Sequence, residues 1–511
     1  MHLIFFRGNL EMADTTKQIG KKLYAYQQNA ISTILSKISD SPNDFNLLYQ
    51  LPTGGGKTVI FSEITRQYIE KNNKKVIILT HRVELAKQTS SMLTEFQVKN
   101  KVINSQVKEL PDQDDYMCFV AMVETLNNRL QDEKINLENI GLVIIDEAHY
   151  NSFRKLFKYF KDCFILGVTA TPLSSNMETP MKDIYNELLV GETVSSLIEY
   201  GFLSKAVPYT FNVGLSGLKV GMNGDYTVKS SEELYIQQQM QSRLLAAYEQ
   251  CAKGTKTLIF NNGIRTSWYV YDTFKEEGYN IKNLDSTVGK QERKEILEWF
   301  KITPGAILTS VGILTTGFDE PTIETIIMNR ATKSLALYFQ MIGRGSRVIP
   351  GKKEFNLIDL GNNIARFGDW TADVNWQQVF KSPNYFLENI IGDDELERNF
   401  VYEMPEEIKG QFNKSDTVKF DVKKEYDKIT NLGLKSKTVL DNSIAQHVKI
   451  CVENSEDVYD AWNLSKLLKD DISHRIKQYS YCIIKNTNNY IKWLEEDYKR
   501  QLRTKISQEF D

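Results

Sequence analysis

The sequence lacks the features that mark membrane-spanning and secreted proteins. No apolar run approaches the roughly 18 residues that a membrane span requires. Residues 3–6 are apolar, but the run is too short for the core of a signal peptide and no small-residue cleavage site follows it. Cysteine is scarce, with five scattered residues in 511 and no C-x-x-C pair, which argues against a disulfide framework and a zinc ribbon. We therefore predict a cytoplasmic protein that has no membrane partner.

Positive charge is not in excess either. The chain has 63 Lys and Arg against 66 Asp and Glu, a formal net charge of -3. Dedicated nucleic-acid binders tend to be basic overall, so this balance counts against that class. It does not exclude a motor that needs only a local basic track and releases its substrate at each step. The five histidines are dispersed, and we predict no histidine metal site.

Short apolar, β-branched runs alternate with helical patterns along the first two-thirds of the chain. Such strands, when helices separate them, are typical of parallel sheets that are covered on both faces. The composition is that of a globular protein long enough for two to four domains. We expect two doubly wound parallel-sheet α/β domains, with strands at residues 47–49, 76–79, 117–121, 142–145, 164–168, 257–260, 306–308, 325–328 and 355–358.

The pattern also suggests where the domains begin and end. We predict an N-terminal extension (1–20), a first α/β domain (21–205), a second (206–372) and an accessory domain (373–511) of unknown role. Glycine, Asn and Asp are frequent at 214–233, which predicts a loop or small insertion. From 460 to 502 apolar residues recur at helical spacing, so we expect the last domain to be mainly helical.

A glycine-rich segment follows the first predicted strand and precedes a predicted helix. It reads Leu51-Pro-Thr-Gly-Gly-Gly-Lys-Thr58, and a G-K-T ending between strand and helix is typical of a phosphate-binding loop. The strict pattern has glycine where this chain has Leu51, so the match covers the last part of the motif. Lys57 would reach the β- and γ-phosphates, and the Thr58 hydroxyl would hold Mg²⁺. The alternative is a glycine turn ahead of a basic helix.

An apolar strand that ends in acidic residues follows about ninety residues later. It reads Leu142-Val-Ile-Ile-Asp-Glu-Ala-His149. Asp146 would hold Mg²⁺ through water, and Glu147 is placed to take a proton from the attacking water. A strand that ends in a solvated acidic turn is the alternative, and the phosphate-binding loop upstream argues against it. The two segments together predict an ATP site with Mg²⁺.

The tetrad Asp146-Glu147-Ala148-His149 resembles motif II of the DEAD/DEAH-box superfamily 2 helicases. Further segments resemble the remaining motifs of that family, in order, over residues 20 to 370. They are Tyr26-Gln27 (Q motif), Thr80-His-Arg-Val-Glu-Leu-Ala86 (Ia), Val120-Ala-Met-Val-Glu-Thr-Leu126 (Ib), Thr169-Ala-Thr-Pro172 (III), Leu258-Ile-Phe-Asn261 (IV), Leu308-Thr-Ser310 with Thr316-Gly-Phe-Asp-Glu-Pro321 (V), and Gln340-Met-Ile-Gly-Arg-Gly-Ser-Arg347 (VI).

The resemblance implies two tandem RecA-like domains with ATP and Mg²⁺ between them. The catalytic residues it implies are Lys57, Asp146, Glu147, Gln340, Arg344 and Arg347. Arg344 and Arg347 look like arginine fingers from the second domain, which neutralise charge during phosphoryl transfer. Gln340 looks like the residue that senses the γ-phosphate or its water. The implied nucleotide-binding residues are Gln27, Pro52, Thr53, Gly54, Gly55, Gly56, Lys57, Thr58, Gly317 and Asp319, and the implied Mg²⁺ ligands are Thr58 and Asp146.

Nucleic acid would lie across both domains, gripped by motifs Ia, Ib, IV and V. Hydroxyls, amides and an arginine can hold phosphates without reading bases. For each of these residues a capping or turn role is the alternative. The nucleic-acid candidates are Thr80, Arg82, Thr125, Asn261 and Thr309, and the residues expected to couple the two sites are His149, Thr169 and Thr171.

Within the superfamily the chain most resembles the XPB, UvsW and type III restriction (ResIII) group. The resemblance rests on Gly317-Phe-Asp-Glu-Pro321, on Gln340 at the head of motif VI, and on the segments 195–203 and 358–368. The group has histidine where this chain has Phe367. These relatives are mostly DNA translocases of bacteria and phages, whereas DEAD-box RNA helicases usually begin motif VI with histidine. We therefore favour DNA over RNA as the substrate.

Several functions remain open at this level. The first is a DNA helicase or translocase in replication, recombination or repair. The second is the motor subunit of a restriction or defence system that works with a separate nuclease, because the chain shows no nuclease constellation. An RNA helicase and an ATP-gated clamp without turnover are further alternatives. The C-terminal domain would bind a nuclease or another accessory protein, and its Lys435, Lys437, Trp462 and Trp493 would contact bases and phosphates or merely cover an aromatic core.

Overall fold

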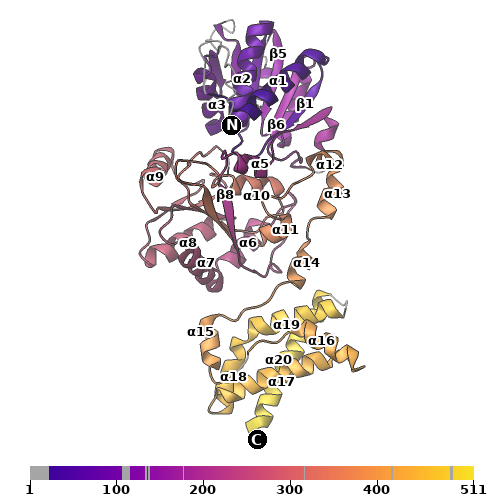
Figure 1. The fold of residues 1–511 in the computed structure, drawn as a ribbon. Coiled ribbons are helices and arrows are strands. Elements are labelled where there is room, and N and C mark those ends of the chain that lie inside the picture. Colours follow the sequence, from indigo (N-terminus) through magenta and orange to yellow (C-terminus); the bar gives the residue numbers. More distant parts are fainter. Residues whose placement is uncertain are drawn as a thin grey trace, which may run out of the picture. The chain divides into compact units, whose positions relative to one another are not determined.

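The computed structural model describes residues 22–105, 115–132, 135, 138–176, 178–315, 317–415, 418–483 and 487–510. The predicted N-terminal extension (1–20) and Thr316 of motif V lie outside these residues. The chain divides into two compact units (Figure 1). One comprises Met1–Phe211 and Leu218–Ile390, and the other comprises Asn212–Gly217 and Ile391–Asp511.

The first α/β domain of the larger unit is built on a seven-stranded sheet in the order β3-β4-β2-β5-β6-β1-β7. Every pair of neighbouring strands in this sheet is parallel. The strands are β1 (Asn46–Gln50), β2 (Lys75–Thr80), β3 (Asn100–Ile103), β4 (Cys118–Met122), β5 (Ile140–Asp146), β6 (Phe164–Thr169) and β7 (Glu187–Val190). The helices are α1 (Ala25–Asp40), α2 (Lys57–Asn72), α3 (Val83–Glu95), α4 (Val123–Gln131) and α5 (Val194–Glu199), with 3₁₀ segments η2 (Asn151–Tyr159) and η3 (Met181–Asp183).

The second α/β domain has a six-stranded sheet in the order β10-β11-β9-β12-β13-β8, again parallel throughout. Its strands are β8 (Lys205–Thr210), β9 (Thr257–Asn261), β10 (Ile281–Leu284), β11 (Ile307–Val311), β12 (Thr325–Asn329) and β13 (Glu354–Asp359). Its helices are α6 (Val228–Tyr235), α7 (Gln238–Cys251), α8 (Ile264–Glu276), α9 (Lys290–Ile302), α10 (Leu335–Ile342) and α11 (Asn363–Phe367).

All nine predicted strands form, and the predicted fold class is confirmed. Four strands were not predicted: β3, β7, β8 and β10. β3, β7, β8 and β10 are the outermost strands of the two sheets. An edge strand has one neighbour and needs fewer apolar residues, so the short apolar runs that marked the central strands are absent from sequences such as Lys205–Thr210.

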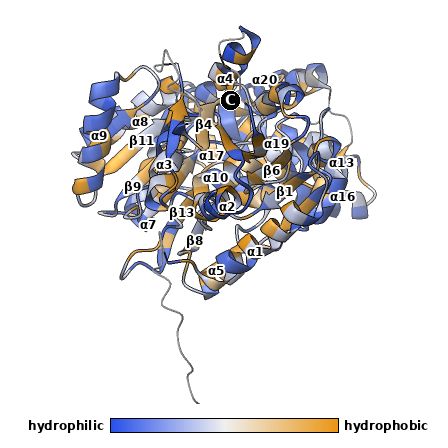
Figure 2. Ribbon diagram, turned by 90° about the horizontal axis from the view of Figure 1, so that it is seen from above, coloured by the Kyte–Doolittle hydropathy of each residue, from blue (hydrophilic) through white to orange (hydrophobic). Residues whose placement is uncertain are grey.

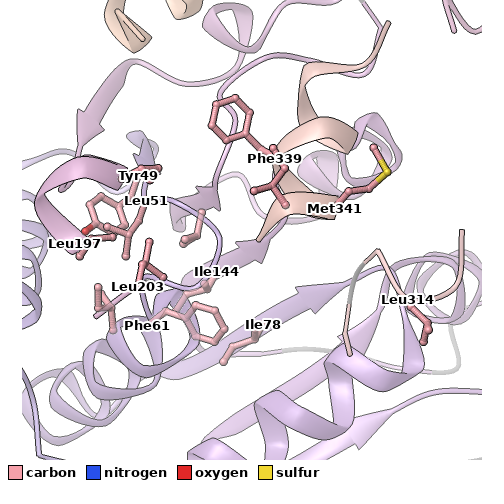
Figure 3. Close-up of a cluster of buried hydrophobic side chains, with 14 of the residues drawn as sticks. Tyr49, Leu51, Phe61, Ile78, Ile144, Leu197, Leu203, Leu314, Phe339 and Met341 are labelled. Carbon is pink, nitrogen blue, oxygen red and sulfur yellow. The ribbon is translucent and has the colours of Figure 1, made fainter. Parts of the chain in front are cut away.

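Apolar side chains of both α/β domains join one buried cluster. Tyr49, Leu51 and Phe61 come from the first domain, while Phe339 and Met341 come from α10 of the second (Figure 3). Strands and helices differ in hydropathy. The strand β11 is coloured mainly as hydrophobic, whereas the helix α9 shows both apolar and polar positions (Figure 2). Burying these apolar side chains stabilises the two sheets.

The structure differs from the sequence expectation at one domain boundary and in one predicted loop. The helices α12 (Trp376–Lys381) and α13 (Pro383–Glu388) belong to the larger unit, so the helical unit begins at residue 391 and not at 373. The Phe380 side chain of α12 packs in the core of the first α/β domain, which explains why this segment belongs to the larger unit. The segment 214–233 is not a loop throughout, because α6 begins within it after a bridge between Val220 and Tyr226.

The second unit is helical, as predicted, and has its own apolar core. Its elements are α14 (Asp393–Arg398), α15 (Glu406–Lys409), η4 (Gly410–Phe412), α16 (Val422–Asn431), α17 (Thr438–Glu453), α18 (Val458–Leu467), α19 (Lys469–Cys482) and α20 (Asn488–Phe510). Asp421 and Asp457 cap α16 and α18 by accepting hydrogen bonds from backbone N–H groups. Over the residues that the structure describes, no helix is both long and apolar enough to cross a bilayer.

Candidate ATP site and nucleic-acid interface

The glycine-rich loop follows β1 and precedes α2. Gly54 and Gly56 adopt φ of +92° and +86°, which residues with a Cβ rarely adopt. The N–H of Gly55 donates to the Pro52 carbonyl across 3.0 Å and closes the turn. Because α2 begins at Lys57, the free N–H groups of its first turn and the positive end of its dipole face the loop. This geometry suits a bound phosphate.

The Lys57 side chain is buried, and its Nζ donates to the Leu51 carbonyl across 3.2 Å. Burial lowers the pKa of this ammonium, and the nearby carboxylates of Glu147 and Asp146 oppose that effect. Arg347 and Arg344 of the second domain also act on the Lys57 charge. The Lys57 side chain therefore lies within electrostatic range of both predicted acids and both predicted arginine fingers.

Asp146 and Glu147 stand where β5 ends. Burial raises the pKa of Asp146 to about 7, and the Glu147 charge adds to the effect. Burial also favours protonation of Glu147, but the cations around it, Lys57 first, outweigh burial and lower its pKa. Glu147 is thus the carboxylate that stays ionised at neutral pH, as a general base must. A divalent cation at Asp146 would keep that group ionised as well.

The backbone of Glu147 is strained. Its φ is +53°, a left-handed conformation that costs a non-glycine residue roughly 1–3 kcal/mol. Its Oε2 is buried and has no hydrogen-bond partner among the residues that the structure describes. Backbone strain of this kind persists where the surroundings hold it, and an orphaned carboxylate oxygen is available to a water molecule.

The three residues expected to couple the sites lie together. His149 Nδ1 is 3.0 Å from the Thr169 Oγ1, and Thr169 Oγ1 donates to the Thr171 carbonyl across 3.1 Å. His149 Nδ1 also lies 3.4 Å from Glu147 Oε2. Motifs II and III are therefore joined by direct hydrogen bonds, with all four side chains buried.

The second domain supplies the residues predicted from motifs V and VI. Arg347 Nε donates to Asp319 Oδ1 across 2.7 Å, and Arg344 donates to the Phe318 carbonyl. Burial lowers the pKa of Arg344 to about 10, so it remains a cation at neutral pH. Gly317 has φ of +73°, and its carbonyl accepts from the Gln88 side chain of the first domain across 2.8 Å.

Motif VI lies directly against the glycine-rich loop. A side chain at Gly54 would collide with the guanidinium of Arg347, and a Cβ at Gly343 would lie 2.5 Å from Thr53 Cγ2. The loop glycines and Gly343 therefore have a second role, because they let the two domains approach closely. This contact brings the second-domain arginines to the place where the loop would hold the phosphates.

Gln27, the nucleotide-binding residue implied by the Q motif, also lies beside the loop. Gln27 is buried on α1, and its Nε2 would be 2.5 Å from a Cβ at Gly56. Tyr26 donates its hydroxyl hydrogen to the Gly55 carbonyl across 2.7 Å. Tyr24 packs on Phe202 with ring centroids 4.1 Å apart, and sequence reasoning had named neither ring as part of the site.

The nucleic-acid candidates fall into two groups. The side chains of Thr80, Asn261 and Thr309 have no exposed surface, and Asn261 Nδ2 donates to Thr309 Oγ1 across 2.7 Å. In this conformation none of these three residues is accessible to a ligand. Arg82 donates to the carbonyls of the motif V loop at residues 312 and 313, so it bridges the two domains. Thr125, on α4, is partly exposed.

Two residues that sequence reasoning missed contact the predicted site residues. Tyr150 follows the DEAH tetrad, and its ring packs against that of His149 with centroids 4.3 Å apart. Lys352 donates to the carbonyls of Pro321, Gly345 and Arg347 at distances of 3.0, 2.7 and 2.9 Å. The position of Tyr150 next to the tetrad was a signal in the sequence, whereas nothing in the sequence marks Lys352.

The residues present fit Mg²⁺ and a nucleotide. Mg²⁺ is usually held by one or two carboxylates together with substrate phosphates and water. Asp146, the half-buried Thr58 hydroxyl and the loop match that donor set. Among the described residues no group of three or more His, Cys, Asp or Glu side chains forms a closed metal site.

Two family models match the chain. The model of the type III restriction enzyme res subunit (ResIII) covers residues 20–174, and that of the helicase conserved C-terminal domain covers residues 238–348. The first match spans the glycine-rich loop and the DEAH tetrad, and the second spans Arg344 and Arg347. The two matched segments therefore carry the residues that the structure gathers at the domain contact.

The chain is similar in sequence to two curated proteins. The chain is 30% identical over 354 residues to the putative ATP-dependent helicase IRC3 of Saccharomyces cerevisiae, covering 65% of this chain and 50% of that protein. It is 25% identical over 394 residues to the type I restriction enzyme EcoAI endonuclease subunit of Escherichia coli, covering 69% and 48%. The chain thus spans about half the length of these two relatives.

Solved structures support the fold. A putative HsdR subunit fragment of a type I restriction enzyme from Vibrio vulnificus matches with a TM-score of 0.52 at 21% identity, covering 66% of this chain and 64% of that one. The type ISP restriction-modification enzyme LlaBIII bound to DNA matches with a TM-score of 0.50 at 17% identity. That match covers 96% of this chain and 38% of the other, so it extends beyond the two α/β domains.

Proposed function

Since the chain carries both conserved domains of the superfamily 2 helicases, ResIII and helicase C-terminal, we propose that it is an ATP-driven motor that moves along DNA. The proposal rests on one observation above all. Arg347 of the second domain lies against Gly54 of the loop, and Arg344 and Arg347 are within electrostatic range of Lys57, which Asp146 and Glu147 also reach. Phosphoryl transfer needs this neutralisation of charge, and here it depends on both domains being together.

The residues divide the work of hydrolysis in a simple way. The loop N–H groups and Lys57 would hold the β- and γ-phosphates, while Thr58 and Asp146 would hold Mg²⁺, which neutralises the developing charge. Glu147 would orient the attacking water and accept its proton. Arg344 and Arg347 would stabilise the charge on the transferred group, and they are absent from the site whenever the second domain moves away.

Movement would follow from the same contact. A nucleotide that binds Lys57 on one side and Arg347 on the other favours the closed arrangement of the domains, and its hydrolysis removes that preference. Repeated closing and opening moves the surfaces at motifs Ia and IV relative to each other along a nucleic acid. Contacts to phosphates, without base readout, would let the motor act on any sequence.

DNA is favoured over RNA by the ResIII match and by the restriction enzymes among the relatives. These similarities also support a second candidate function, a motor subunit of a restriction or defence system that works with a separate nuclease. A clamp without turnover is disfavoured because Glu147, Arg344 and Arg347 are all present. An RNA helicase is an outcome that the experiment below would reveal.

The test is steady-state ATPase activity of the purified chain with single-stranded DNA, duplex DNA, branched DNA and RNA. Glu147→Gln is the inactive control. We expect strong stimulation by DNA that disappears in the control variant. Stimulation by RNA alone would replace DNA by RNA in the proposal. Bound ATP without stimulation by any nucleic acid would contradict the motor function.

A further inference from the structure

A segment that follows motif VI returns to the first α/β domain. Within the residues that the structure describes, the chain passes from the first domain to the second where β8 begins, at residue 205, and passes back after α11. The returning segment covers residues 371–381 and includes α12, and we call it the strap.

The first domain holds the strap along its length. Hydrogen bonds of 2.8–2.9 Å join the two. They run from Ser195 Oγ to the Thr371 carbonyl, from Gln377 Nε2 to the Leu188 carbonyl, and from Lys182 Nζ to the Lys381 carbonyl. Val379 and Phe380 of the strap are buried, and Phe380 lies in the core of the first domain. The strap is therefore anchored on the first domain by both polar and apolar contacts.

The strap also contacts α10, the helix on which motif VI begins. The Trp376 ring lies edge-on to the Phe339 ring, with centroids 5.8 Å apart and planes inclined by 63°. Phe339 is buried and directly precedes Gln340 on α10. Trp376 packs in addition against the apolar core that contains Phe380. One side chain of the strap thus touches both the core of the first domain and the motif VI helix of the second.

Motif VI continues from α10 to the residues that lie against the glycine-rich loop. Gly343 follows α10 directly, and a Cβ there would be 2.5 Å from Thr53 Cγ2. Arg347 lies against Gly54. A shift of α10 away from the first domain would therefore separate Arg347 from the loop. The Trp376 contact opposes this shift, because the shift would return buried apolar surface to water.

The packing beside this contact is incomplete. A pocket of about 110 Å³ is lined by Pro52 of the loop, Ala170 of motif III, Phe339 and Trp376. The buried Gln50 also lines it, and Gln50 Oε1 has no hydrogen-bond partner in the described part of the chain. Close-packed cores resist movement, whereas here the two rings have room to shift. The contact therefore suits a joint between domains that close and open.

We propose that Trp376 is a positioning residue that holds motif VI against the first domain through Phe339, and so favours the closed arrangement of the domains before ATP binds. The inference rests on the proposed function, because the closed arrangement is the one in which the motif VI arginines would act on the nucleotide. The strap reduces the free energy that ATP binding must supply to close the domains. Its contribution therefore affects the KM for ATP more than the chemical step.

The first test compares Trp376→Ala and Trp376→Phe with the wild-type chain in ATPase assays at varied ATP and saturating single-stranded DNA. We expect Trp376→Ala to raise the KM for ATP about 5- to 20-fold, the usual range for a lost coupling, with kcat within about twofold of wild type. Trp376→Phe keeps an aromatic contact with Phe339 and should restore most of the wild-type KM. Tyr385→Ala, which removes an exposed ring on α13, is the control and should leave the KM unchanged.

A role in stability alone would have a different signature. It would reduce the amount of folded enzyme, and hence the apparent kcat, without changing the KM for ATP.

The second test is hydrogen exchange of the chain without nucleotide or nucleic acid. Trp376→Ala should speed exchange in the peptides that cover residues 51–56 and 343–347, because an opened domain contact exposes both. If Trp376→Ala does not fold, Gln377→Ala replaces it, since this change removes only the bond to the Leu188 carbonyl. The same two peptides should then exchange faster in Gln377→Ala and not in the matched control Gln378→Ala, whose side chain is also exposed.

The outcomes separate this inference from the proposed function. Either an unchanged KM in Trp376→Ala, or faster exchange confined to α12, would overturn the inference and leave the motor in place. The exchange measurement uses no nucleic acid. A wild type that no nucleic acid stimulates would therefore contradict the motor, while faster exchange at residues 51–56 and 343–347 would still support the role of the strap.

Discussion

The Nε of Arg347 donates a hydrogen bond to the Oδ1 of Asp319 across 2.7 Å, so a motif V carboxylate holds a motif VI guanidinium in place. Arg344 is held by the neighbouring Phe318 carbonyl. Both contacts lie within the second domain and do not depend on a nucleotide. The arginines are thus oriented before hydrolysis, which lowers the reorganisation that the transition state would otherwise require.

Removing the Arg347 guanidinium should nearly abolish hydrolysis. We expect Arg347→Ala to lower kcat about 10³-fold, the lower end of the effect of an arginine finger. Asp319→Asn, which removes only the holding charge, should cost about tenfold. Arg265→Ala, on α8, is the matched control. Steady-state ATPase kinetics measure all three, and equal losses in the Arg347 and Asp319 variants would show that Asp319 does more than orient Arg347.

Glu147 should be required for chemistry and not for nucleotide binding. Glu147→Gln keeps the shape of the side chain and removes the base, so kcat should fall about 10²- to 10⁴-fold. ATP affinity should change little, because Lys57 and the loop remain. Equilibrium binding of a fluorescent ATP analogue and single-turnover hydrolysis measure the two properties. The exposed Glu298→Gln is the control, and a large loss of affinity in Glu147→Gln would contradict the assignment.

Lys352 should stabilise the backbone of motif VI through its hydrogen bonds. Its Nζ donates to three backbone carbonyls of motifs V and VI, and Lys352→Met would leave them without this donor. We expect a loss of stability of about 1–3 kcal/mol and a lower kcat with little change in the KM for ATP. Lys353→Met, at the exposed neighbouring position, should do neither. Denaturant unfolding and ATPase kinetics test this, and unchanged kcat would restrict Lys352 to a role in folding.

The helical unit should lose stability in mild acid. Burial lowers the pKa of His447 to about 4, and Arg475 adds to the effect although Asp471 opposes it. An unfolded histidine titrates near 6.5. Below that pH the unfolded state binds a proton that the native state resists, so stability is present above about pH 6.5 and lost toward pH 4. The expected loss is roughly 1.4 kcal/mol per pH unit.

The measurement is urea unfolding at several pH values, read by pulsed hydrogen exchange at one labelling pH in the peptides of α17 and α19. The native pKa of Asp471 is also lowered, so its own contribution is lost only below the pH range in question. His447→Gln should reduce the pH slope by one proton. A slope that His447→Gln leaves intact would assign the effect to other groups, of which the neighbouring His474 is the first to examine because burial lowers its pKa in the same direction.

The local sequence was sufficient for the central strands and for the glycine-rich turn between β1 and α2. Strands such as β2 and β5 are apolar over Val76–Leu79 and Leu142–Ile145 because helices cover both of their faces, and the G-K-T ending requires a particular backbone. The edge strands and the boundary at residue 391 could not be predicted in this way. An edge strand places few constraints on its sequence. The packing position of Phe380 is set by the core of the first α/β domain, which forms only on folding.

The sequence by itself determined the order of the motifs, the fold class and the residue types of the candidate ATP site, because each of these depends on local backbone chemistry or on periodicity. The tertiary structure decided which groups meet. Only folding brings Arg347 against Gly54, places Tyr150 between two histidines, and turns the Asn261 and Thr309 side chains inward. These contacts join residues tens to hundreds of positions apart, and their geometry depends on the packing of whole sheets, which no short segment encodes.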